Sequence, residues 1–244
     1  MSVPGAPGIP PRPPQRPERF QPYLSALATR GSSPLVANPY HGPHGGRRLD
    51  NLRRYLQTVW AWGPSLAIVG EAPGYRGCAV TGVPFTSRQL LSTDTGRWGL
   101  FEGYHGDAEL GGAWAEATAT VVWRTVLATL PSPPLLANAF PFHPHRSGRP
   151  ASNRSLAAAE LAEGLTYLEG VLGLFPGLPV VAAGRVAGRA LARLGIAPLA
   201  VVRHPAHGGA TAFVAGLRRA AGSGAAPDPH GSPIAERQTP GSLD

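Results

Sequence analysis

The stretch LAIVGEAPG at residues 66–74 decides the fold of this chain of 244 residues. It begins with a short apolar run, which is typical of a buried strand, and continues at once into a loop of Gly and Pro. Further short apolar runs lie at residues 135–139, 180–184 and 199–203. Because helical patterns separate these runs, we expect an α/β chain in which the strands form one buried, parallel sheet.

Helix candidates surround the expected strands. They lie at about residues 46–61, 86–92, 113–130, 153–175, 185–195 and 209–220. Ser152 and Asn153 are residue types that cap helices, so we expect the helix over 153–175 to begin there. The alternation of strands and helices predicts a three-layer α/β/α sandwich with a mostly parallel, four-stranded central sheet.

The two ends of the chain contain little that a folded domain could bury. Residues 1–19 are rich in Pro and Arg, and residues 221–244 are rich in Gly, Pro and Ser. We therefore expect a disordered arm over 1–19, a single folded domain over 20–220 and a disordered tail over 221–244.

Charge and cysteine content narrow the class of protein. The chain has 22 basic residues, all of them Arg, against 14 acidic residues, and its formal net charge of +8 favours a polyanionic partner. The apolar runs are far shorter than the roughly 20 residues of a membrane helix, so we expect no membrane partner. The single cysteine, Cys78, cannot form an internal disulfide, which indicates a reducing, cytoplasmic location.

Four side chains of complementary chemistry follow the expected strands. Glu71 comes directly after the first strand, and Phe85 lies further along the same connection. Asn138 ends the second strand, and His204 follows the fourth. Parallel strands end at one edge of a sheet, where ligands bind. These groups can hold a flat heterocycle and cleave a bond to it, although each one alone also has an ordinary role in a turn, strand end or loop.

Three segments together resemble motifs of the uracil-DNA glycosylase superfamily. GEAPGYRGCAVTGVPF (70–85) resembles its first motif, LANAFPFHPH (136–145) with the later SNR (152–154) its uracil-reading segment, and RHPAHGG (203–209) its second motif. The first motif is most similar to the thermophile-type branch, which carries an iron–sulfur cluster on four cysteines. One cysteine cannot hold that cluster, so we expect a catalytic domain of this superfamily over 20–220 with no cofactor.

The resemblance implies a role for each of these side chains. Phe85 would stack on a base flipped out of the DNA, and Asn138 would pair with O4 and N3–H of uracil. Glu71 and His204 would be catalytic. Glu71 would face the sugar cation and activate water, and His204 would stabilise the departing uracil anion at O2. Ala72 would bring the backbone close to the base.

Basic residues near the predicted edge are candidates for contacts with the DNA backbone. They are Arg146, Arg149, Arg154, Arg203 and His207. Another set recurs at every fourth position of a predicted helix and would form one stripe, which is either a solvated face or a phosphate-tracking surface. It comprises Arg185, Arg189 and Arg193.

The sequence argues against a metal site and departs from the motifs of the family at two places. His143 and His145 have a spacing seen in metal sites, but no Asp, Glu or Cys lies near them in sequence, so we expect no metal. Gly74 stands where some relatives carry an aromatic ring that excludes the methyl group of thymine. The second motif also lacks an apolar wedge to fill the gap that a flipped base leaves.

The sequence thus predicts a monomeric DNA glycosylase that removes uracil from DNA, leaves an abasic site and initiates base excision repair at the bacterial nucleoid. Two alternatives stay open. The first is a glycosylase for another deaminated base, such as hypoxanthine or xanthine. The second is a non-catalytic relative that binds uracil or abasic sites in DNA.

Overall fold

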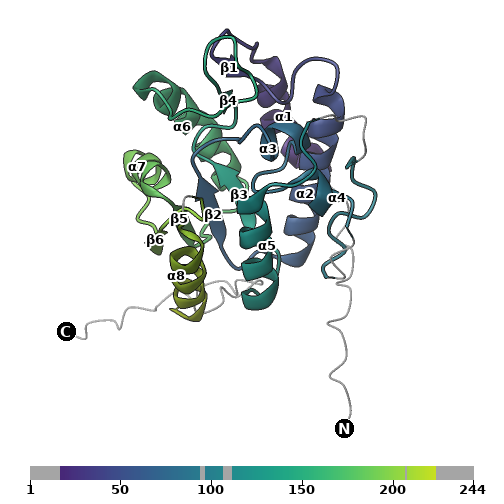
Figure 1. The fold of residues 1–244 in the computed structure, drawn as a ribbon. Coiled ribbons are helices and arrows are strands. Elements are labelled where there is room, and N and C mark those ends of the chain that lie inside the picture. The colour runs from purple at the N-terminus through teal and green to yellow at the C-terminus, as the bar shows by residue number, and fades with distance from the viewer. Residues whose placement is uncertain (1–16, 94–96, 107–111, 207, 224–244) are drawn as a thin grey trace, which may run out of the picture.

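The computed structural model describes residues 17–93, 97–106, 112–206 and 208–223. Its centre is a parallel sheet in the strand order β3, β2, β5, β6 (Figure 1). The strands span Ala67–Gly70 (β2), Leu135–Asn138 (β3), Val180–Ala183 (β5) and Ala200–Val202 (β6). They coincide with the apolar runs of the sequence, and the expected α/β architecture with a four-stranded parallel sheet is confirmed.

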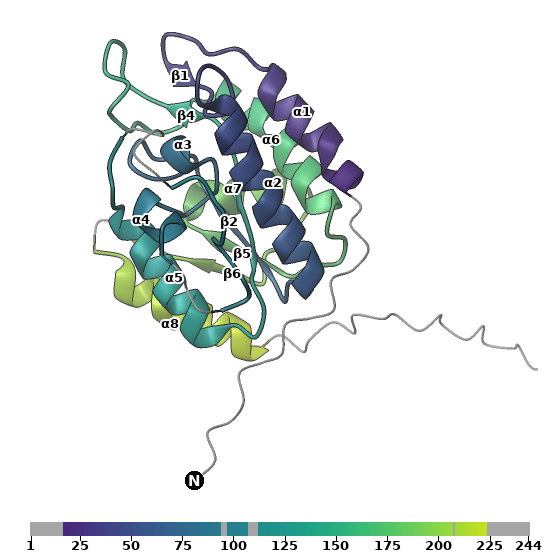
Figure 2. The ribbon, with the colours of Figure 1, turned by 90° about the vertical axis from the view of Figure 1, so that its right-hand side faces the viewer.

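Helices cover both faces of this sheet (Figures 1 and 2). On one face lie α6 (Ala158–Gly173) and α7 (Arg185–Arg193), and on the other lie α5 (Ala117–Thr129) and α8 (Ala210–Ser223). The remaining long helices, α1 (Gln21–Thr29) and α2 (Gly45–Trp62), pack against each other, and α1 also contacts α6. The central strands are therefore buried between two helical layers, as their apolar sequences require.

A tyrosine of α2 protects the edge strand β3. The Tyr55 hydroxyl donates to the carbonyl oxygen of Pro134 and accepts from the backbone N–H of Leu136 at 3.2 Å. Tyr55 is fully buried, so its hydroxyl supplies the hydrogen bonds that backbone groups of an edge strand would otherwise make with water or with another strand.

Several short elements were not expected from the sequence. They are the 3-10 helix η1 (Pro17–Phe20), α3 (Cys78–Thr81) and an antiparallel pair formed by β1 (Val36–Ala37) and β4 (His143–Pro144). Helix α4 (Arg88–Leu91) is shorter than its expected range of 86–92. Elements of two to four residues are too short to show a helical or strand periodicity in the sequence.

The folded part extends beyond the expected bounds of 20–220. Residues 17–19 belong to η1, and residues 221–223 belong to α8. Arg19 explains the earlier start, because its guanidinium donates to the carbonyl of Leu174 at 3.0 Å and lies 3.5 Å from the ring centre of Trp60. The rest of the expected arm and tail, 1–16 and 224–244, lies outside the described residues.

Helix α6 begins at Ala158, later than the expected start at 153. Ser152 and Asn153 do not cap it, and the first turn is held instead by Glu160, which accepts from the backbone N–H of Ala157 at 2.8 Å. The segment from Ser152 to Ala157 is not helical because its polar groups bond to distant parts of the chain.

Candidate active site

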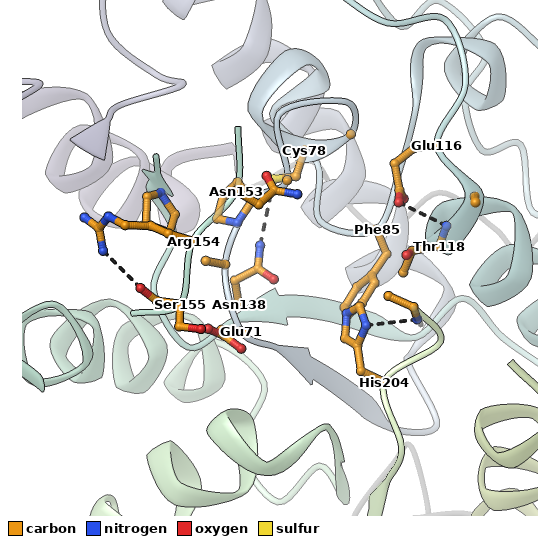
Figure 3. Close-up of a pocket in the computed structure, with 17 residues that line it drawn as sticks. Glu71, Cys78, Phe85, Glu116, Thr118, Asn138, Asn153, Arg154, Ser155 and His204 are labelled. Atoms are coloured by element: carbon orange, nitrogen blue, oxygen red, sulfur yellow. Dashed lines mark hydrogen bonds between the residues drawn. The ribbon is translucent and has the colours of Figure 1, made fainter. Parts of the chain in front are cut away.

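The ends of the strands bring the predicted side chains into one cleft. Gly70 at the end of β2 pairs in register with Asn138 at the end of β3, so Glu71 emerges beside Asn138. His204 lies just beyond the end of β6 at the same edge of the sheet. The cleft has a volume of about 740 Å³ (Figure 3). Its lining includes every predicted catalytic and base-binding residue: Glu71, Ala72, Phe85, Asn138 and His204.

Phe85 is held in a backbone conformation that a bulky residue rarely adopts. Its φ is 54°, in the left-handed region, and its side chain is 8% exposed. The ring passes so close to β2 that a Cβ atom on Gly70 would lie 2.5 Å from Cζ of Phe85. Backbone strain of this kind persists where the surrounding structure fixes a functional group. The ring is thus fixed as one wall of the cleft.

Asn138 is oriented by the neighbouring helix α3. Its Nδ2 lies 3.9 Å from Sγ of Cys78, and Figure 3 shows its carboxamide oxygen turned away from that sulfur. Burial raises the pKa of Cys78 to about 12, so its sulfur is a protonated thiol and not a nucleophile. With the amide fixed in this way, Asn138 offers one donor and one acceptor to the cleft.

The ring of His204 has a defined tautomer. Its Nδ1 accepts a hydrogen bond from the backbone N–H of Ala206 at 3.2 Å. A nitrogen that accepts carries no proton, so a neutral imidazole keeps its proton on Nε2 and is a donor there. The ring lies 6.4 Å from the ring of Phe85, centre to centre, at an angle of 33°. His204 can therefore donate to a flat ligand that stacks on Phe85.

Glu71 accepts a hydrogen bond from a backbone group that is distant in sequence. Its Oε1 accepts from the N–H of Leu156 at 3.3 Å. In Figure 3, Glu71 and His204 lie on either side of Asn138. The cleft therefore holds a carboxylate and an imidazole donor together with the carboxamide, and these groups can stabilise positive and negative charge in one reaction.

The loop after Glu71 contributes Ala72, Pro73 and Gly74 to the lining of the cleft. His143 supports this loop, because its Nδ1 lies 2.8 Å from the carbonyl oxygen of Pro73. A Cβ atom on Gly74 would meet only the carboxamide of Asn153, at 3.9 Å, so the space beside Gly74 is open. The absence of an aromatic ring at Gly74, noted in the sequence, thus leaves an open region in the cleft.

Several lining residues were not assigned a role from the sequence. They are Cys78, Glu116, Thr118, Asn153 and Ser155. Glu116 caps α5, where its carboxylate oxygens accept from the N–H groups of Thr118 at 3.0 Å and Ala119 at 2.6 Å. An acidic cap of this kind was the signal that could have corrected the expected helix start at 113. Asn153 lies in the SNR segment, and the family resemblance marked that segment without singling out this residue.

The predicted DNA-backbone contacts have different environments. Arg146 and Arg149 are exposed on a tight turn, and Arg203 is exposed beyond β6. Arg154 differs from the prediction, because every N–H of its guanidinium is used inside the protein. Nε donates to His145 O, Nη1 to Ser155 O and Glu160, and Nη2 to Leu35 O and Glu160. No donor is left for a phosphate. His207 lies outside the described residues.

The two histidines with metal-site spacing have structural partners instead. In the part of the chain that the structure describes, no three His, Cys, Asp or Glu side chains come together as a possible metal site. Both ring nitrogens of His143 face backbone carbonyls, those of Pro73 at 2.8 Å and Pro150 at 3.0 Å.

None of the described helices is long and apolar enough to span a membrane.

Comparisons with known proteins identify one relevant fold. No family model and no curated protein sequence matches this chain. Among solved structures, the crystal structure of wild-type SMUG2 from Pedobacter heparinus is similar, with a TM-score of 0.56 and 14% sequence identity. The similarity covers 82% of this chain and 93% of the SMUG2 chain. At this level of identity, the comparison shows a shared fold over nearly the whole domain.

Proposed function

We propose that this protein is a DNA glycosylase that hydrolyses the N-glycosidic bond of uracil in DNA and leaves an abasic site. The observation that carries this proposal is the meeting of Glu71, Phe85, Asn138 and His204 in one cleft. The fold shared with SMUG2, a DNA glycosylase, supports the class of reaction. The formal charge of +8 is suited to a polyanionic substrate.

Substrate binding begins with extrusion of the base, because the bond to the sugar is inaccessible inside a stacked duplex. DNA glycosylases as a class take their target base out of the helix for this reason. The extruded base stacks on Phe85, a contact that contributes about 1–3 kcal/mol and does not select among bases. Asn138 makes the selection. Its Nδ2 donates to O4 of uracil and its carboxamide oxygen accepts from N3–H, whereas the amino group of cytosine mismatches this pattern.

Cleavage separates charge between the sugar and the base. As the bond breaks, its electron pair moves into uracil and the sugar acquires oxocarbenium character. Nε2–H of His204 donates to O2, where negative charge accumulates, and a neutral imidazole is sufficient for this. Glu71 faces the cationic sugar and accepts a proton from the water that attacks C1′. In this proposal both charges are stabilised by side chains that line the cleft.

The proposal is tested with oligonucleotides that contain a single uracil, hypoxanthine or xanthine, in single- and double-stranded form. We expect an abasic product, seen as alkali-labile strand cleavage, at uracil. The absence of abasic product from the single- and double-stranded uracil substrates would contradict the proposal. Tight binding of uracil-containing DNA without product would instead indicate a non-catalytic DNA-binding protein.

Glu71 provides a sharper test of mechanism. In Glu71→Gln the side chain keeps its shape and can still accept from Leu156, but it loses its charge and basicity. We expect the single-turnover rate to fall by roughly 100-fold or more, since general acid–base catalysis contributes about 10²–10⁴-fold. DNA affinity in a gel-shift titration should stay within about twofold of the wild type. An unchanged single-turnover rate would remove Glu71 from the mechanism.

A second candidate substrate follows from the same carboxamide. Hypoxanthine and xanthine also place a carbonyl next to an N–H, so Asn138 can pair with them as with uracil. The open space beside Gly74 favours this alternative, because a purine needs more room than a pyrimidine. The substrate panel separates the two, since a purine-specific enzyme would leave uracil intact.

A further inference from the structure

One segment that the sequence predicted to be helical crosses the candidate site instead. We call residues 152–157 the crossing segment. Its contact with Glu71 is the backbone N–H of Leu156, which donates to Oε1 at 3.3 Å. It also contacts the adjoining loop, where the Asn153 side chain accepts from the backbone N–H of Tyr75 at 3.1 Å. The crossing segment thus touches both the carboxylate and the loop that carries it.

The crossing segment is held in place by one arginine. The guanidinium of Arg154 forms a two-pronged ion pair with Glu160, with N–O distances of 2.5 and 2.8 Å. It also donates to the carbonyls of Leu35 at 3.0 Å and His145 at 3.0 Å. These partners lie in three separate regions, the loop before β1, the loop after β4 and the first turn of α6. Arg154 therefore fixes the crossing segment to the rest of the fold at several points.

From this arrangement we propose that the Leu156 N–H positions the carboxylate of Glu71 for catalysis, and that Arg154 is the positioning residue that holds the amide there. The inference rests on the proposed function, because it assigns Glu71 to the reaction. The amide occupies one carboxylate oxygen and restricts rotation of the side chain, so the second oxygen keeps a constant direction. Placement of a reacting group matters because a displacement of about 1 Å can cost on the order of 100-fold in rate.

The amide itself is tested by Leu156→Pro, which deletes the donor, against Leu156→Ala, which keeps it and loses the side chain. We expect the proline variant to lose roughly tenfold to 100-fold in single-turnover rate, with DNA affinity unchanged. The alanine variant should stay within about threefold of the wild type. Equal losses in the two variants would overturn the assignment, because the side chain and not the amide would then be responsible.

Arg154 is tested by Arg154→Lys, which keeps the charge but cannot form the two-pronged pair, against Arg124→Lys and Arg124→Gln at an exposed position of α5. We expect Arg154→Lys to lower kcat by about tenfold or more with KM and DNA affinity unchanged. Glu160→Gln should produce the same pattern to a lesser degree. If Arg154 instead contacts phosphate, Arg154→Gln would weaken DNA binding and reduce the salt dependence of log K by about one, and that result would overturn the proposal.

A readout independent of activity separates this inference from the proposed function. Amide hydrogen exchange at Leu156 should be slow in the wild-type protein and in Arg124→Lys, and faster in Glu71→Ala and Arg154→Lys. Unchanged exchange would show that the amide is not held on Glu71. If the wild type cleaves no base but this exchange pattern is found, the proposed function fails while the contact between the crossing segment and Glu71 stands.

Discussion

At the scale of single residues, the proposed base selection depends on how one buried carboxamide is held. Asn138 is 8% exposed, its Nδ2 contacts Sγ of Cys78, and its oxygen lies close to the backbone of Gly70. If the nitrogen and oxygen of this amide exchanged places, its N–H group would face N3–H of uracil, and two donors would oppose each other. If Asn138 reads the base as proposed, its neighbours contribute to selection without touching the base.

Asn138→Ala is expected to lower kcat/KM on uracil-containing DNA by roughly tenfold to 100-fold or more, because the base edge would be left without its partners. Affinity for undamaged DNA, measured by fluorescence anisotropy, should not change. An equal loss of both quantities would show that Asn138 is needed for folding and does not read the base.

Gly70→Ala tests how tightly the cleft is built. The new Cβ would lie 2.5 Å from Cζ of Phe85 and 2.9 Å from Oδ1 of Asn138, so both would have to move. We expect a loss of about 1–3 kcal/mol in the free energy of unfolding, together with reduced activity. The control is Gly188→Ala in α7, where the new Cβ would make an ordinary contact with Val201 at 3.5 Å. For Gly188→Ala, urea unfolding should show an increase of no more than about 1 kcal/mol in the free energy of unfolding.

At the scale of elements, α7 carries the basic stripe that the sequence predicted. Arg185, Arg189 and Arg193 are all exposed. The first two line a second groove of about 970 Å³, which shares Glu71 and His204 with the cleft. A phosphate chain that leaves the cleft over this groove would meet positive charge at once. Because the stripe lies beside the candidate site, its position favours contact with the phosphates of DNA over the alternative of a face that contacts only solvent.

Replacement of this charge should weaken DNA binding without changing base choice. We expect Arg185→Gln with Arg189→Gln to reduce the salt dependence of log K by about two and to weaken affinity equally for uracil-containing and undamaged DNA. The control is Arg124→Gln with Arg218→Gln, an equal charge change at exposed positions of α5 and α8. If both pairs give the same result, binding responds only to net charge and not to the stripe.

At the scale of the whole molecule, His143 connects two loops that frame the site. It is 3% exposed and lies between the carbonyls of Pro73 and Pro150. Burial lowers the pKa of His143 below its usual value, and this effect outweighs the carbonyl contacts, which favour the protonated ring. The folded protein therefore takes up this proton at a lower pH than the unfolded chain.

Mild acid should consequently destabilise the fold. Below a pH of about 6.5 the unfolded chain binds the proton first, so the free energy of unfolding falls until the folded His143 is also protonated. Urea unfolding at about pH 7.5 and pH 5.5, a window above the carboxylate pKa values, should show lower stability at the lower pH. His143→Gln should reduce that difference. If the stability difference between the two pH values is as large in His143→Gln as in the wild type, other groups cause it.

Much of the fold was predictable because it depends on local pattern. The apolar runs at 66–70, 135–139 and 180–184 are buried on both faces of a parallel sheet, and such strands are apolar throughout. Parallel topology then fixes that their ends meet, so Glu71, Asn138 and His204 could be grouped in advance. Short elements such as α3 were missed, because a single turn has no periodicity to detect.

The sequence by itself determined the layered α/β architecture and the set of side chains at one edge of the sheet, since both follow from periodicity and from the order of the strands. Only the tertiary structure decided how those side chains are held. The sequence suggested a helix from Asn153 and a phosphate contact for Arg154, whereas the segment crosses the site and Arg154 is fully bonded within the protein. The reason is that the partners of Arg154, which are Leu35, His145 and Glu160, come close to it only in the folded chain, and no local sequence pattern predicts such contacts.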